Sequence, residues 1–178
     1  MLYLPKGAVL MVITISRQFA SGGHEIGQKL AEKLGFKFYD KELIYKAAEM
    51  SGISPDILKE VDEKAASSLL YSLSLGASSI VHGFSGTAQL PINDRVFIAQ
   101  QKLIKEYANS DCIIVGRCAD YVLKDNKNCI KIFIYADFDF RRERAINVEG
   151  IDENSVNAFI AKKDKTRANY YNYYADIK

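Results

Sequence analysis

The chain has 178 residues, of which 48% are hydrophobic and 26% are charged. This length and composition are typical of one globular domain with its own core, and they exclude a disordered or collagen-like chain. With 24 basic and 22 acidic residues, the net charge of +2 is too balanced for a dedicated nucleic-acid-binding protein, so we expect no nucleic-acid partner. No apolar run reaches the ~20 residues of a membrane span, and the three cysteines lack metal-ligand spacing, which together predict a cytoplasmic protein.

A strand, a glycine-rich turn and a helix open the domain. The β-branched run at 12–16 predicts a strand, RQFASGGHEIG follows it, and apolar residues then recur at helical spacing until Gly35. Because this strand could begin the domain by itself, residues 1–10 are interpreted as a leader or a vector-derived remnant and residues 11–178 as a single domain. FKFYD predicts a second short strand that ends at Asp40, and residues 41–50 a second helix.

The remaining elements continue the alternation. A helix is predicted from residue 54, a less regular and mobile segment over 65–89, and a helix over 91–108. The apolar runs 112–115 and 130–135 predict buried neighbouring strands, separated by a loop and a short helix. A basic helix and a long tyrosine-rich helix over 154–178 follow. This order predicts a three-layer α/β fold with a central parallel sheet of about four or five strands.

The first strand–helix junction is the strongest candidate site. A glycine-rich turn there points backbone N–H groups at one spot, backed by the helix dipole, which suits a phosphate. The usual phosphate-loop pattern G-x-x-x-x-G-K-[ST] is kept only at Gly23, since Gln18 stands at the first glycine, His24 at the lysine and Glu25 at the hydroxyl residue. A purely structural turn therefore stays open as the alternative at this point.

Several segments in order resemble one known family. SRQFASGGHEIGQKLAEKLGFKFYDKELI is similar to the opening of the cytidylate-kinase-like family, whose members share the altered loop. YDKELIYKAA resembles the D-x-G-x-x-Y-R segment of cytidylate kinases, and LPINDRVFIAQQ their L-P-x-V-R-x-x-L-x-x-x-Q segment. VGRCADYVL followed by KIFIYA resembles G-R-D-x-x-x-V-x and K-I-F-L-x-A. Together these segments cover most of residues 12–174.

The resemblance implies a P-loop nucleotide-kinase fold that transfers the γ-phosphoryl group of ATP, with Mg²⁺, to a nucleoside monophosphate, CMP or dCMP first. It also implies an acceptor-binding helical insertion near 40–95 and a lid near 141–170. The residues expected to hold the donor phosphates are Ser21, Gly22, Gly23, His24 and Glu25. Those expected to bind the acceptor are Asp40, Lys46, Arg95, Arg117 and Asp120. Those expected to stabilise the transferring charge are Arg17, His24, Arg141, Arg144 and Arg167. No metal ligand is assigned.

Other interpretations stay open beside this one. An exposed basic face also explains Arg141 and Arg144, helix capping explains Asp40, and an ion pair within one helix explains Asp164. Lys41 and Glu42 replace small residues beside the acceptor site of cytidylate kinases, which favours a kinase for another small hydroxyl or phosphate acceptor. His24 and Glu25 favour a third possibility, a catalytically inactive nucleotide-binding or regulatory protein.

Overall fold

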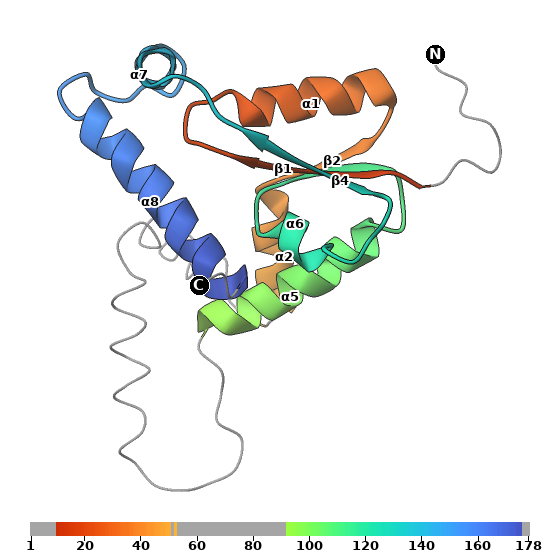
Figure 1. The fold of residues 1–178 in the computed structure, drawn as a ribbon. Helices are drawn as coiled ribbons and strands as arrows, with labels where there is room; N and C mark the ends of the chain where they lie inside the picture. The colour runs from red at the N-terminus through yellow and green to blue at the C-terminus, as the bar shows by residue number, and fades with distance from the viewer. Residues whose placement is uncertain (1–9, 51, 53–91, 176–178) are drawn as a thin grey trace, which may run out of the picture.

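The structure is a computed structural model that describes residues 10–50, 52 and 92–175 (Figure 1). The strands are β1 (Val12–Arg17), β2 (Lys37–Tyr39), β3 (Cys112–Val115) and β4 (Cys129–Ile134). The helices are α1 (Gly23–Leu34), α2 (Glu42–Met50), α5 (Ile92–Tyr107), α6 (Ala119–Val122), α7 (Phe138–Asn147) and α8 (Val156–Ala175). The helix expected from residue 54, the segment 65–89 and nearly all of the leader 1–10 lie outside the described residues.

The four strands form one parallel sheet in the order β2-β3-β1-β4. The central strand β1 pairs on one side with β3, Val12 opposite Cys112, and on the other with β4, Val12 opposite Cys129. Short apolar strands separated by helices produce this arrangement, because parallel neighbours need a crossover and are buried on both faces. The predicted α/β fold with a central parallel sheet is confirmed.

Helices cover both faces of the sheet (Figure 1). Because successive strand residues point to opposite faces, Ile13 and Ile15 of β1 pack on the side of α1. Val12 points to the opposite face, where it packs in another core cluster with Leu43 of α2 and Leu103 of α5. On the first face a Cβ at Gly27 would lie 3.1 Å from the Phe38 ring and 3.2 Å from Ile15, so the absent side chain lets α1 approach the sheet closely.

The last two helices lie beyond the carboxyl ends of the strands. α7 lies near the start of α1, and α8 runs along this edge of the sheet toward α5 (Figure 1). α8 packs against α7 and the loop after β1 through a small core of Ala20, Ala145, Val156 and Ile160. Its other end packs on α5, where the rings of Phe97 and Tyr174 stack 3.8 Å apart. Tyr174 therefore packs in the interface between α8 and α5.

Candidate functional site

The loop between β1 and α1 places the start of α1 at the carboxyl edge of the sheet, where the parallel strands end. The N–H of Gln18 bonds to the carbonyl of Ile134, and the buried Ser21 lies with Oγ 2.9 Å from the carbonyl oxygen of Gln18. Gly22, with φ of 81°, turns the chain into the helix in a left-handed conformation that favours glycine. The first N–H groups of a helix have no partner within it, so the amides from Gly23 onward are available to an anion.

Arg17 lies across this loop in a space kept open by two glycines. A Cβ at Gly116, the residue after β3, would lie 2.0 Å from Nη1 of Arg17. A Cβ at Gly23 would lie 2.7 Å from Cβ of Arg17. Burial, together with the nearby Arg167 and Arg117, lowers the pKa of Arg17 to about 10, while Asp40 acts in the opposite direction.

Arg117 and Arg167 bring two more positive charges to this edge. Arg167 of α8 donates from Nη1 to the carbonyl of Arg17 over 3.2 Å, and burial lowers its pKa. Arg117 follows Gly116 with a left-handed φ of 56°, which is unusual for a residue with a side chain. Each of the three arginines is close enough to affect another electrostatically. Such a concentration of guanidinium groups favours an anionic ligand.

Asp40 joins His24 to Arg17. Its buried carboxylate has Oδ2 at 2.6 Å from Nδ1 of His24 and Oδ1 at 3.4 Å from Nη2 of Arg17. The ring of Phe38 meets the His24 ring edge to face, with centroids 5.3 Å apart. Helix capping is thus an incomplete account of Asp40, because both oxygens of its carboxylate point to charged or titratable side chains of the site.

Glu25 is surrounded by positive charge at the loop position where a hydroxyl is usual. Its carboxylate accepts from Lys29 at 2.6 Å and from Nη2 of Arg144 at 2.7 Å. Hydrogen bonds from Lys29 and then from Arg144 lower the pKa of Glu25. Arg144 of α7 therefore contacts the first turn of α1 through Glu25. Lys29 and Arg144 offset the negative charge of Glu25, which would otherwise repel a phosphate.

Arg141 and Asp164 clamp the loop to α7 and α8. Asp164 accepts from the N–H of Phe19 at 2.7 Å with Oδ1 and pairs with buried Arg141 through Oδ2. Arg141 also donates to the carbonyl of Phe19. For Arg141, this buried pairing excludes the exposed basic face that its sequence allowed. For Asp164, a pair within its own helix does not describe these contacts either, since its partners lie on α7 and the loop.

The residues expected on the acceptor side do not all gather at the arginine cluster. Asp120 follows Arg117 closely and accepts from the hydroxyl of Tyr171 at 2.7 Å, while its other oxygen is buried without a hydrogen-bond partner. Lys46, in the middle of α2, instead lies over the ring of Tyr107, with Nζ 5.2 Å from the ring centroid. Arg95 lies in the first turns of α5, half buried.

Sequence reasoning missed the two contacts that tie the site together. The pairing of His24 with Asp40 joins residues that the pattern had assigned to different substrates. The clamp on Phe19 involves Asp164, for which the D-x-x-R spacing with Arg167 was the available signal. Gly116 could have been recognised from its place between a buried strand and an arginine.

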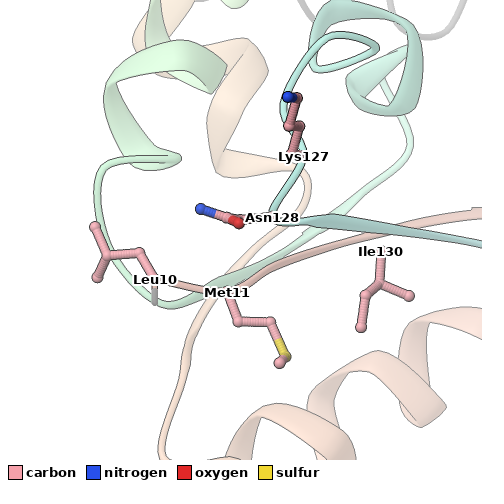
Figure 2. Close-up of a pocket in the computed structure, with 5 residues that line it drawn as sticks. All are labelled: Leu10, Met11, Lys127, Asn128 and Ile130. Atoms are coloured by element: carbon pink, nitrogen blue, oxygen red, sulfur yellow. The ribbon is translucent and has the colours of Figure 1, made fainter. Parts of the chain in front are cut away.

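A separate hollow lies at the amino ends of the strands, around the starts of β1 and β4. Figure 2 shows the side chains that line it, which are Leu10, Met11, Lys127, Asn128 and Ile130. None of them belongs to the candidate site. In the described ranges, no helix is long and apolar enough to cross a membrane. The same part of the chain contains no group of three or more His, Cys, Asp or Glu that could hold a metal ion.

Comparisons with known proteins agree with this architecture. The model of the Cytidylate kinase-like family matches residues 12–178. A crystal structure of an uncharacterized protein from Eubacterium ventriosum is 29% identical, with a TM-score of 0.63, and covers 94% of this chain and 80% of that one. Shikimate kinase from Bacteroides thetaiotaomicron is similar in fold, at 16% identity and a TM-score of 0.51, over 93% of this chain and 83% of that one. No curated protein matches the chain.

Proposed function

Since the chain belongs to the cytidylate kinase-like family, we propose that it transfers the γ-phosphoryl group of ATP to a small acceptor, with CMP or dCMP as the first candidates. Membership supports a phosphotransferase of the nucleotide-kinase type. The observation that carries the proposal is the convergence of Arg17, Arg117 and Arg167, with Arg17 packed against Gly23 at the start of α1. Phosphoryl transfer depends mainly on positioned positive charge, so this cluster suits the reaction.

The donor phosphates fit the loop by the chemistry of its groups. The amides from Ser21 to Gly23 and the start of α1 offer N–H donors, and Arg17 lies across the same turn. When bound, Mg²⁺ would neutralise phosphate charge, and it usually keeps several waters, so it needs few protein ligands. Glu25 stands at the loop position where a hydroxyl usually binds this ion, and Arg144 and Lys29 already engage its carboxylate.

The acceptor is proposed to lie between Arg117 and Asp120, at the carboxyl end of β3. Open α/β sheets bind ligands at the carboxyl ends of their strands, and these two residues follow β3 directly. Asp120 is held by Tyr171, which supports a fixed orientation. A second candidate, a kinase for an acceptor other than a nucleoside monophosphate, is favoured by the contact between His24 and Asp40.

The test is ADP formation from Mg-ATP against a panel of nucleoside monophosphates. We expect turnover with CMP or dCMP, and a fall of at least ~100-fold in Arg117→Ala, because removing one positioned charge-stabilising group costs that much. Arg142→Ala is the matched control, since Arg142 pairs with exposed Glu153 on the surface. No turnover with any acceptor, in a sample that is folded and binds ATP, would contradict the proposal in favour of an inactive nucleotide-binding protein.

A further inference from the structure

The contact between His24 and Asp40 gives the site a group that none of its arginines provides. An ionised carboxylate only accepts hydrogen bonds, so the 2.6 Å contact requires Nδ1 of His24 to donate to Asp40. In the neutral ring, Nε2 then carries the lone pair. The imidazole is 55% exposed at the start of α1, whereas Asp40 is buried behind it. A histidine held by a carboxylate in this way is suited to take up a proton.

The neighbouring carboxylates are engaged elsewhere. Glu25 is held by Lys29 and Arg144, and Asp164 by Arg141 and the N–H of Phe19. Asp120 accepts from the hydroxyl of Tyr171 with one oxygen, and its other oxygen is buried. Among the described residues of the loop region, Nε2 of His24 is therefore the best placed proton acceptor.

A proton acceptor at Nε2 of His24 matters only for acceptors that react through a hydroxyl group. The attacking oxygen of a phosphate acceptor is already anionic near neutral pH, so it needs no base. A hydroxyl must lose its proton as its oxygen attacks. The three arginines already supply positive charge for the transferred phosphoryl group, so His24 is not needed as one more cation.

We infer that the site phosphorylates a hydroxyl group of a small molecule, with Nε2 of His24 accepting the proton and Asp40 positioning the ring. The inference rests on the proposed phosphoryl transfer and concerns its acceptor. The hydroxyl oxygen forms a bond to the γ-phosphorus while the bond from that phosphorus to the bridging oxygen breaks and ADP leaves. The hydroxyl proton moves to Nε2, and the resulting charge on the ring is balanced by Asp40.

The experiment compares acceptors that differ in the reacting group. ADP formation from Mg-ATP is measured with cytidine, with CMP and with water alone, and ATP affinity is measured separately by calorimetry. The key variant is His24→Lys, because lysine restores the usual cation of a phosphate loop but holds its proton near neutral pH. Gln28→Lys is the matched control, since it adds the same charge one turn further along α1, at an exposed position.

We expect cytidine phosphorylation or ATP hydrolysis by the native protein, reduced at least ~100-fold in His24→Lys with ATP affinity kept. Transfer to CMP should change less than about tenfold, and Gln28→Lys should behave like the native protein. Asp40→Asn should lower the rate with hydroxyl acceptors on its own but not in a His24→Gln background, a non-additivity that a merely structural role would not produce.

Two results would overturn the inference while leaving the proposed function standing. One is transfer to CMP by a native protein that uses neither cytidine nor water. The other is a His24→Lys variant that matches or exceeds the native rate with the hydroxyl acceptors, which would make His24 a substitute cation. Failure of all transfer, with ATP bound, would instead remove the proposed function itself.

Discussion

Gly116 decides where the guanidinium of Arg17 can lie. An alanine there would place its Cβ 2.0 Å from Nη1, so the guanidinium must move from this position. Gly150 has a similar backbone, with φ of 69° against 78°, but nothing lies within 4 Å of its Cβ position. An alanine at either glycine strains the backbone, but only an alanine at Gly116 also displaces Arg17.

We predict that Gly116→Ala and Gly150→Ala each lose about 1–2 kcal/mol of unfolding free energy from backbone strain. Only Gly116→Ala should weaken ATP binding, by about tenfold, because an interaction with charged phosphate is worth at least ~1.4 kcal/mol. Urea denaturation and calorimetric titration measure the two quantities. Equal ATP affinities in the two variants would contradict the role given to Arg17.

The side-chain contacts were the part of the site that sequence alone could not supply. The spacing indicated a phosphate-binding turn at Ser21–Gly23, but the partner of His24 depends on where β2 ends relative to α1. The choice between a surface arginine and a buried one at Arg141 likewise depends on how α7 meets the loop. Such contacts come from packing of distant segments, which a pattern of residue types does not encode.

At the scale of elements, the Arg141–Asp164 pair joins α7 and α8 to the loop between β1 and α1. Arg141 is buried, so removing its partner would leave an uncompensated charge as well as an unsatisfied N–H on Phe19. We predict that Asp164→Ala loses about 3 kcal/mol of unfolding free energy, measured by urea denaturation. Glu153→Ala breaks the exposed pair with Arg142 and should lose about 0.5 kcal/mol or less. A similar effect for both variants would mean that the clamp contributes little.

The elements themselves were largely predictable. Their periodicity and order placed the strands and helices of the described residues within a few positions, since buried parallel strands and amphipathic helices leave strong patterns. The last helix was expected over 154–178 and is described as Val156–Ala175. Its weak periodicity did not indicate where it packs. Only the family resemblance, through the lid near 141–170 and Arg167, placed it beside the site, because its path depends on Asp164, Arg167 and the tyrosines together.

For the whole molecule, the buried thiols predict a loss of stability in alkaline solution. Burial raises the pKa of Cys112 to about 11 and of Cys118 to about 12, from 9.0. The folded thiols keep protons that the unfolded chain releases, so their contribution is fully present below pH 9 and is lost as pH rises toward 11. Arg17, with its pKa lowered to about 10, acts in the opposite direction only above that pH.

We predict that the unfolding free energy falls by about 1 kcal/mol per buried thiol between pH 8 and pH 10, measured by urea denaturation. Cys118→Ala should be less stable at pH 8 and should show a smaller decline. A constant unfolding free energy over this interval would contradict the burial of these thiols.

The pairing of β1 also sets when the site can exist during synthesis. Val12 finds its strand partners only at Cys112 and Cys129, and Arg17 meets Arg167 later still. A ribosome must therefore release most of the chain before the loop after β1 has a sheet behind it, and such distant pairings are slow to form. Until then VITIS is an unpaired apolar strand, the kind of segment that aggregates or recruits a chaperone. Nucleotide affinity should thus emerge late on the nascent chain, after the sheet has closed around its first strand.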